Sequence, residues 1–289
     1  MDSAIRTIGF IGTGIMGAPM AQHLLDAGYG LVVYNRTRAK AEELVGHGAR
    51  WADSPAAVAA ESDAVITIVG LPADVEQVYF GGILERARRG ALLIDMTTSS
   101  PSLAARLQAE GAERGLRVLD APVSGGQAGA KAATLAIMVG GDAADFAAAQ
   151  PLLEKMGKKI VHCGPAGSGQ RVKLTNQTLI AANIVGLAEG LAFARKGGLD
   201  PKLVLSTLAE STGNSNMLKV YGEKIFGGDY AAGFMVDHFI KDMSVALAEA
   251  DALGLDLTSL RNALERFRKL RQEFAAGSAG IQAVARLYS

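Results

Sequence analysis

The stretch that most constrains this chain is a short apolar run that ends in three glycines. Residues 8–11 read Ile-Gly-Phe-Ile, and Gly12, Gly14 and Gly17 follow at the spacing G-x-G-x-x-G before a helical pattern begins. This arrangement predicts a strand that turns directly into a helix. The first glycine would permit the tight turn, the second would let a pyrophosphate approach the backbone, and the third would let the helix pack close to the strand. The sequence therefore predicts dinucleotide binding, with a purely structural glycine turn as the alternative.

The segment after the second predicted strand indicates which dinucleotide binds. Residues 31–34 form that strand, and Asn35, Arg36 and Thr37 follow it, about where a nucleotide site meets the adenosine ribose. An NAD site usually places Asp or Glu there. Asn35 brings no carboxylate to repel a 2′-phosphate, and Arg36 can pair with that phosphate while its guanidinium lies against the adenine. We therefore predict NADP, with solvated arginines at a helix start as the alternative.

Length and composition indicate a globular protein of about two domains. The chain has 289 residues, of which 49% are hydrophobic and 20% charged. Its 29 basic and 29 acidic residues give a formal net charge of zero, so neither nucleic acid nor a membrane surface is expected as a partner. The single cysteine, Cys163, cannot form an internal disulfide, and Asp2 with an early strand argues against a signal peptide. These features predict a cytoplasmic protein.

Strands and helices alternate through the first half of the chain. This alternation predicts an α/β Rossmann-type doubly wound parallel sheet, whose ligands bind beyond the carboxyl ends of the strands. The segments Gly70–Pro72 and Thr97–Thr98 follow predicted strands and are expected at that edge. The further predicted strands are residues 64–69, 91–95, 117–120, 133–140 and 159–162.

The composition changes sharply around residues 164–169, where we place the domain boundary. Residues 1–164 would form the NADP-binding Rossmann domain, and residues 165–289 an all-α domain for substrate binding and oligomerisation. A long connecting helix is predicted over about 170–196, apolar on nearly every side and so expected to be surrounded by the second domain or a partner subunit. Asn183 and Glu189 interrupt it, which argues against a membrane span. The later predicted helices are residues 201–208, 214–221, 236–253 and 257–275.

Lys173 lies near the start of this long helix, with Asn176 and Gln177 on the same face. A lysine and two amides on so apolar a helix are costly unless they face a polar cleft. An ammonium group there can donate a proton or hydrogen bond to a carbonyl oxygen and stabilise the negative charge that develops as hydride arrives at the carbon. Asn176 would hold the lysine or share that oxygen. The alternative is a lysine whose charged end reaches water.

Two further segments carry polar groups suited to a ligand. Ser124, Gly125 and Gly126 follow a strand and form a loop whose hydroxyl and backbone amides suit a carboxylate, or form an ordinary turn. Lys241 and Asp242 precede an apolar helical run, where a solvated surface pair is the alternative. The histidines show no metal-like spacing with Asp, Glu or Cys, so no metal site is predicted.

Four motifs together resemble the β-hydroxyacid dehydrogenase family, which contains 3-hydroxyisobutyrate dehydrogenase, tartronate semialdehyde reductase and glyoxylate/succinic semialdehyde reductase. They are residues 9–17, 120–126, 169–177 and 241–243, and the resemblance covers nearly the whole chain. Their order and spacing favour the functional interpretation of each motif over its structural alternative. The chain departs from the family at residues 277–284, where an aspartate-containing motif is usual.

The resemblance implies that Lys173 is the catalytic lysine and Asn176 its amide neighbour. Imine reductases look similar but replace this lysine, so its retention favours carbonyl chemistry. The substrate-binding residues expected are Ser124, Gly125, Gly126, Gln177, Phe234 and Asp242. The cofactor-binding residues expected are Gly12, Thr13, Gly14, Ile15, Met16, Gly17, Asn35, Arg36, Thr37, Leu71, Pro72, Glu76, Thr97, Phe234 and Lys241.

The predicted function is therefore an NADPH-dependent reductase of small aldehyde acids such as glyoxylate, succinic semialdehyde or tartronate semialdehyde, working reversibly as a 3-hydroxy acid dehydrogenase. The substrate is expected in a cleft between the two domains, where it can be oriented before reaction. A homodimer or homotetramer is expected. Two alternatives are an NAD-dependent 3-hydroxyisobutyrate dehydrogenase and a non-catalytic NADP-binding module whose long helix serves oligomerisation.

Overall fold

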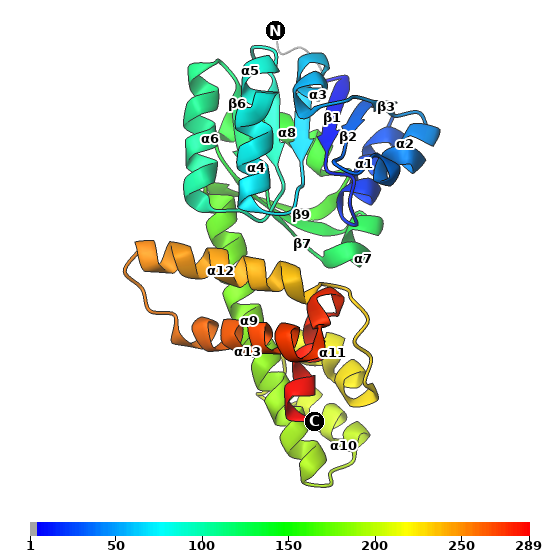
Figure 1. The fold of residues 1–289 in the computed structure, drawn as a ribbon, viewed down its shortest axis with the longest axis vertical. Helices are drawn as coiled ribbons and strands as arrows, with labels where there is room; N and C mark the ends of the chain where they lie inside the picture. Colours follow the sequence, from blue (N-terminus) through cyan, green and yellow to red (C-terminus); the bar gives the residue numbers. More distant parts are fainter. Residues whose placement is uncertain (1–4) are drawn as a thin grey trace. The chain divides into compact units, whose positions relative to one another are not determined.

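The computed structural model describes residues 5–289, so Asp2 lies outside it. Backbone contacts divide the chain into two compact units, Met1–Lys173 and Leu174–Ser289. The division falls inside one continuous helix, α9 (Ser168–Lys196), which begins two residues before the predicted start. Figure 1 labels most of the helices and strands of both units. Each unit is described below by itself.

The first unit contains the predicted sheet. Among residues 5–289, nine strands join in it, and β1 to β6 pair in parallel in the order β3-β2-β1-β4-β5-β6. The order reverses at β1, so the carboxyl ends of β1 and β4 lie at the switch point where such sheets bind ligands. These strands are β1 (Thr7–Ile11), β2 (Gly30–Tyr34), β3 (Arg50–Trp51), β4 (Ala64–Thr67), β5 (Leu92–Asp95) and β6 (Arg117–Asp120).

The far edge of the sheet is mixed. β8 (Leu135–Gly140) runs antiparallel to β6 and to β7 (Val123–Ser124), and β9 (Gly157–Gly164) pairs in parallel with β8. The predicted strand over residues 133–140 is confirmed but begins two residues later. The doubly wound fold is confirmed, with β8 and β9 running against the direction expected for a wholly parallel sheet.

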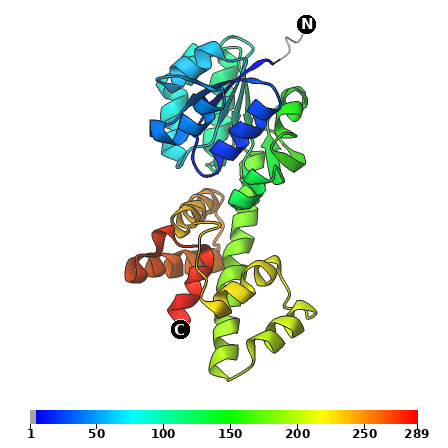
Figure 2. The same cartoon turned by 90° about the vertical axis from the view of Figure 1, so that its right-hand side faces the viewer.

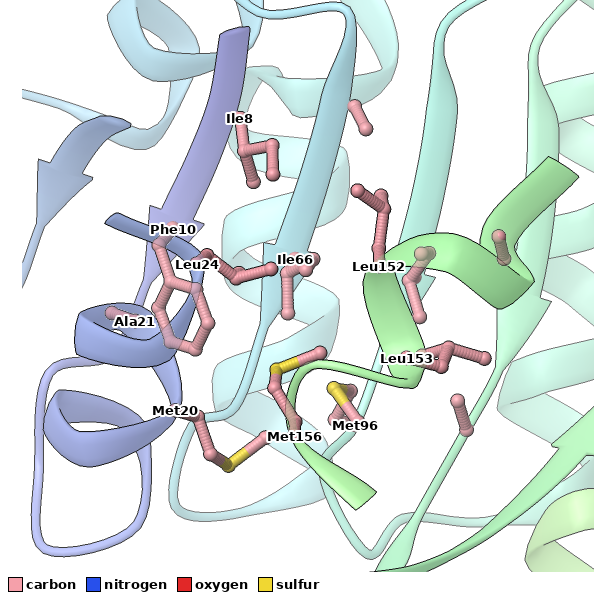
Figure 3. Close-up of a cluster of buried hydrophobic side chains, with 14 of the residues drawn as sticks. Ile8, Phe10, Met20, Ala21, Leu24, Ile66, Met96, Leu152, Leu153 and Met156 are labelled. Carbon is pink, nitrogen blue, oxygen red and sulfur yellow. The ribbon is translucent and has the colours of Figure 1, made fainter. Parts of the chain in front are cut away.

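Alternate residues of each central strand face opposite sides, so the sheet carries two apolar cores. Ile8 and Phe10 pack on one side with helix α1 (Gly17–Asp26) and helix α8 (Ala143–Leu153), and Figure 3 shows Phe10 beside Met20 and Leu24. Figure 2 shows helices on both faces of the sheet. The opposite core includes Ile11 and residues of α3 (Pro55–Glu61), α4 (Pro72–Val78), η2 (Tyr79–Ile83), α5 (Leu84–Arg86) and α6 (Pro101–Glu113).

The polar residues before α3 and α6 explain where these helices begin. Ser54 accepts a hydrogen bond from the N–H of Ala57 at 3.1 Å, and Ser100 accepts one from Leu103 at 3.0 Å, each with a proline next in the chain. A serine followed by a proline is a usual sequence signal for such a helix start. The remaining short helices of this unit are η1 (Arg38–Ala41), α2 (Glu42–Gly46) and α7 (Gly126–Lys131).

The second unit is helical, as predicted. Ala181 and Ile184 of α9 pack against Phe239 and Phe267, whose rings meet edge to face at 5.1 Å. Its other helices are α10 (Pro201–Ala209), α11 (Asn216–Gly227), α12 (Val236–Ala252) and α13 (Thr258–Phe274), followed by η3 (Ala276–Ser278) and η4 (Ile281–Tyr288). Gln282, in the segment that departs from the family pattern, is buried and donates to the carbonyl oxygens of Asp229 and Ala231. These bonds tie the carboxyl-terminal segment to the loop before α12.

Helix α9 is covered on one face only. Ala181, Ile184 and Ala188 are buried, whereas 61% of Leu179 and 83% of Phe193 are exposed. Within residues 5–289, α9 is the one helix long and apolar enough to cross a membrane by length and composition, and a third of its most apolar window is buried in the structure. Core helices pass the same test, so these two properties are weak support for a membrane span.

Candidate functional site

The glycine-rich turn after β1 has the geometry that a dinucleotide needs. Gly12 has a φ of +101°, and a Cβ at this position would collide with the carbonyl oxygen of Ile68. A Cβ on Gly17 would collide with the carbonyl oxygen of Gly12. By contrast, a Cβ on Gly14 would meet no atom within 4 Å, so the space beside Gly14 is open. A pyrophosphate can therefore approach the backbone where the sequence predicted, and these residues fit an NAD(P) cofactor.

Asn35 ties this turn to the end of β2. Its side-chain oxygen accepts a hydrogen bond from the N–H of Thr13 at 3.1 Å, and its amide group donates to the carbonyl oxygen of Thr37 at 2.9 Å. The sequence identified Asn35 only through the absence of a carboxylate. In the structure this side chain also fixes the backbone of two predicted cofactor-binding residues.

Arg36 lies beside a carboxylate that the sequence analysis missed. Its guanidinium is largely exposed and pairs with Asp74 at 3.3 Å. The other carboxylate oxygen of Asp74 accepts the N–H of Leu71 at 2.9 Å, so Asp74 also caps the start of α4. The signal available in the sequence was an acidic residue in the first turn after Leu71 and Pro72. Asp74 thus brings the segment after β4 next to the segment after β2.

The other predicted cofactor-binding side chains differ in their surroundings. Thr97, two residues beyond β5, is buried, and its hydroxyl oxygen accepts the N–H of Val69 at 2.9 Å. Leu71 and Ile15 are about half exposed. Glu76 pairs with Arg106 of α6 at 2.6 Å, and both side chains are about half exposed. The structure thus brings the residues that follow β1, β2, β4 and β5 to one edge of the sheet.

A buried carboxylate, also missed by the sequence analysis, supports Thr97. Asp95 accepts hydrogen bonds from the hydroxyl of Thr67 at 2.9 Å and from the N–H of Thr97 at 3.1 Å. Burial raises the pKa of Asp95 to about 6, and its hydrogen bonds with Thr97 and Thr67 lower it in part. Burial also raises the pKa of Tyr79, which lies 3.3 Å from the Thr67 hydroxyl. This network fixes the end of β5 and the backbone of Thr97. Residues 97–99, which follow β5, are called the predicted cofactor loop below.

Asp120, at the end of β6, anchors the start of α9. Its two carboxylate oxygens accept the N–H groups of Gly167 at 2.7 Å and Gln170 at 2.8 Å. Burial raises the pKa of Asp120, and these N–H groups lower it. The side chain of Gln170 reaches the cofactor loop, since it donates to the carbonyl oxygen of Thr97 at 2.7 Å and accepts the N–H of Ser99 at 2.9 Å. The sequence analysis gave neither Asp120 nor Gln170 a role of its own.

The predicted carboxylate-binding segment begins on β7. Ser124 is partly buried on this strand, and Gly125 and Gly126 have φ angles of +137° and +60°. Both values lie in the region that favours glycine. The segment is shorter than the predicted loop, because α7 begins at Gly126.

Lys173 follows Gln170 by one turn of α9 and is 7% exposed. This burial argues against the alternative of a lysine whose charge reaches open water. Along the same helix, Asn176 donates to the side-chain oxygen of Gln177 at 2.9 Å, and Gln177 donates to Asp242 at 2.6 Å. Gln177 and Asp242 are buried. The two predicted amides therefore belong to one hydrogen-bonded chain.

Lys241 and Asp242 lie on α12 with little exposure. Their ammonium and carboxylate groups are 2.8 Å apart, with 14% and 4% of the side chains exposed. The alternative of a solvated surface pair is therefore wrong. Phe234 precedes this helix and packs against Phe239 at 5.4 Å. Among residues 5–289, no group of three or more His, Cys, Asp and Glu side chains is placed to hold a metal ion.

A Rossmann-type sheet with an open glycine turn, followed by a long helix that carries a buried lysine and continues into a helical unit, is typical of the class of NAD(P)-dependent oxidoreductases. Residues 7–164 match the family model described as the NAD-binding domain of 6-phosphogluconate dehydrogenase. Residues 167–288 match the model described as NAD-binding of NADP-dependent 3-hydroxyisobutyrate dehydrogenase. The chain belongs to the 3-hydroxyisobutyrate dehydrogenase family of β-hydroxyacid dehydrogenases, which act on the CH–OH group of their donors.

Individual relatives agree with this assignment over nearly the full length of the chain. The uncharacterized oxidoreductase YkwC of Bacillus subtilis is 46% identical over 98% of this chain and 99% of its own. The NAD-dependent L-serine dehydrogenase of Pseudomonas aeruginosa is 39% identical over 94% of each chain. The solved structure of Mycobacterium tuberculosis 3-hydroxyisobutyrate dehydrogenase with L-serine has a TM-score of 0.90 and 32% identity over 98% of this chain and 99% of that one. Membership of this enzyme family argues against the non-catalytic module.

Proposed function

We propose that this enzyme is an NADPH-dependent reductase of small aldehyde acids, such as glyoxylate, succinic semialdehyde or tartronate semialdehyde, and that it oxidises the corresponding hydroxy acids in the reverse direction. The observation that carries the proposal is the buried lysine at the start of α9. Lys173 is 7% exposed, although an ammonium group is costly to bury without a polar role. Lys173 lies one turn after Gln170, whose backbone N–H donates to Asp120 at the end of β6. This bond fixes the start of α9 relative to the sheet.

Lys173 acts as general acid and base in this proposal. NADPH, when bound, supplies the hydride that reaches the carbonyl carbon of the substrate. The ammonium group of Lys173 donates its proton to the carbonyl oxygen, which would otherwise carry the negative charge. In the reverse direction the neutral amine accepts the hydroxyl proton. Asn176, one turn along the helix, orients this group.

The substrate is held through its carboxylate. Ser124 offers a hydroxyl, and the backbone at Gly125 and Gly126 offers N–H groups without side chains in the way. We assign Gln177, Phe234 and Asp242 to substrate binding on the basis of the family resemblance. A small acid suits such a site, because a carboxylate and a carbonyl group together fix its orientation.

NADP is proposed as the preferred cofactor. Asn35 stands where a carboxylate would repel a 2′-phosphate, and the exposed Arg36 can meet that phosphate. One relative is named as NAD-dependent, so the preference has to be measured in this enzyme. The ratio of kcat/KM for NADPH and NADH tests it, and a clear preference for NADH would reject the proposal. An NAD-linked 3-hydroxyisobutyrate dehydrogenase would then be the better description.

The chain is proposed to work in the cytoplasm as a homodimer or homotetramer, with residues 1–164 binding NADP and residues 165–289 serving substrate binding and subunit contacts. The exposed Leu179 and Phe193 on α9, with Leu203 on α10, support an apolar face that another copy covers. Light scattering measures the mass in solution. A monomer at micromolar concentration would contradict this part of the proposal.

The central experiment replaces the lysine. Lys173→Ala should lower kcat by about 10²- to 10⁴-fold with glyoxylate or succinic semialdehyde, because the proton donor is lost. The Kd for NADPH should stay within about threefold. Lys196→Ala, at the exposed end of the same helix, is the matched control and should keep wild-type turnover. Activity of Lys173→Ala within a few-fold of the wild type would show that this lysine is not the acid.

A further inference from the structure

A buried glutamine joins the predicted cofactor loop to the start of the lysine helix. Gln170 has no exposed surface, and its side-chain amide forms two hydrogen bonds to the backbone of one loop. Its nitrogen donates to the carbonyl oxygen of Thr97 at 2.7 Å, and its oxygen accepts the N–H of Ser99 at 2.9 Å. Lys173 lies one turn further along the same helix. We propose that Gln170 is a positioning residue that fixes Lys173 relative to the cofactor loop, an inference that rests on the proposed function.

The two bonds require this particular side chain. The amide NH₂ of Gln170 donates to a carbonyl oxygen, and its amide oxygen accepts from an N–H group. A side chain of this length is needed to reach both groups. An ionised glutamate would bring a second acceptor against the Thr97 carbonyl, and methionine would bring neither group. Because the site is buried, water does not replace a lost partner, and an unsatisfied group there is costly. The loop backbone and the helix start therefore hold each other in one arrangement.

Gln170 and its hydrogen bonds to the predicted cofactor loop are called the clamp here. The loop and the start of α9, which the clamp joins, are each also bonded to the sheet. On the loop side, Asp95 accepts the N–H of Thr97, and the hydroxyl oxygen of Thr97 accepts the N–H of Val69. On the helix side, Asp120 accepts the backbone N–H of Gln170 itself. The side-chain amide of Gln170 thus links the predicted cofactor loop directly to the start of α9, and both segments are anchored. A shift of about 1 Å between reacting groups can cost about 100-fold in rate, so this bond bears on turnover without touching the reacting atoms.

Three variants test the inference. Gln170→Met keeps the size and removes both hydrogen bonds, so kcat should fall by about 10- to 100-fold while the substrate KM changes less than about threefold. The primary isotope effect with NADPH deuterated at the transferred position should rise, because hydride transfer becomes more rate-limiting. Gln150→Met, an exposed glutamine on α8, is the control and should match the wild type.

In Gln170→Glu, lowering the pH should restore the two hydrogen bonds and with them kcat. A protonated carboxyl has one donor and one acceptor, as the amide has, whereas the ionised form has acceptors only. The ratio of its kcat to that of the wild type should therefore rise about tenfold between pH 8 and pH 5.5. Asp95 accepts the N–H of Thr97 and Asp120 accepts the backbone N–H of residue 170, while Arg171 and Lys173 follow on the same helix. Both proteins share these charged groups, so the ratio isolates position 170. A ratio that remains well below one at pH 5.5 would overturn the inference.

A readout without turnover separates this inference from the proposed function. In Gln170→Met the N–H of Ser99 loses its acceptor, so its hydrogen exchange should become at least about tenfold faster, while exchange in β1 and β4 stays unchanged. Unchanged protection of Ser99, or a Gln170→Met enzyme with wild-type kcat, would refute the positioning role while leaving the reductase intact. A wild-type enzyme that reduces no aldehyde acid would instead reject the proposed function, and the Ser99 exchange would still decide whether the clamp exists.

Discussion

Replacing Asp95 with asparagine should remove a pH dependence of stability that the wild-type enzyme carries. The carboxylate of Asp95 is buried, and one of its oxygens accepts both the Thr67 hydroxyl at 2.9 Å and the Thr97 N–H at 3.1 Å. An asparagine has the same shape and keeps an oxygen for both donors. The substitution therefore removes the charge while preserving two of the hydrogen bonds that hold the cofactor loop.

The magnitude follows from the pKa of this carboxyl. Burial raises the pKa of Asp95 from 3.8 to about 6, so the folded state holds the proton more tightly than the unfolded chain. The resulting stability is fully present below pH 4 and is lost as the pH rises to about 6. At about 1.4 kcal/mol for each pH unit, the loss approaches about 3 kcal/mol. Between pH 4.5 and pH 7.5 it amounts to about 2 kcal/mol, because the titration is already under way at the lower value.

Urea unfolding at these two pH values measures the effect. The free energy of unfolding of Asp95→Asn minus that of the wild type should be about 2 kcal/mol larger at pH 7.5 than at pH 4.5, with equal m-values. Burial also raises the pKa of Asp120, but both proteins retain this group, so its own titration largely cancels in the difference. Asp53→Asn, at an exposed position, is the control and should follow the wild-type curve. If the difference for Asp95→Asn were independent of pH, burial would not raise the pKa of this carboxyl, and the reasoning would fail.

Two further predictions concern the cofactor site. Gly12→Ala should lower the free energy of unfolding by about 2–4 kcal/mol, because φ is +101° and the new Cβ meets the Ile68 carbonyl, whereas Gly14→Ala should fold normally and only weaken NADPH binding. Equal losses of stability in urea titrations would contradict this. Arg36→Ala should raise the Kd of NADPH about tenfold or more and leave that of NADH unchanged, while Asp74→Asn, which frees the arginine from its carboxylate, should lower the Kd of NADPH. Fluorescence titration measures both, and parallel changes for the two cofactors would show that Arg36 does not meet the 2′-phosphate.

The parts of the fold that depend on local signals could be predicted from the sequence. The strand that ends just before Gly12 and the helix cap at Ser54 each follow from a few adjacent residues whose backbone conformations are specific. The two-residue strands β3 and β7 are too short for periodicity to detect. The reversed direction of β8 escaped prediction for a different reason, because side-chain alternation is the same in parallel and antiparallel strands.

The groups that support the site could not be predicted, because their roles depend on strand order. Asp95 and Asp120 each end an apolar strand and look alike in the sequence, yet one holds the loop at Thr97 and the other holds the start of α9. Only the pairing of β5 with β6 places them side by side. Similarly, Asp74 and Arg36 are 38 residues apart, and no local pattern relates them. Local sequence identifies which residues can do chemistry, whereas topology decides which polar residues hold them in place.

The direction of the hydrogen bonds around Gln177 bears on the two roles proposed for Asn176. An ionised Asp242 only accepts hydrogen bonds, so Gln177 turns its NH₂ group toward it and leaves its oxygen to accept from Asn176. Asn176 therefore donates an N–H to Gln177, and its side-chain oxygen is its hydrogen-bond acceptor. An acceptor suits an ammonium group better than it suits a substrate oxygen that is gaining negative charge. The buried carboxylate thus favours Asn176 as the residue that holds Lys173, and the lysine as the donor to the substrate.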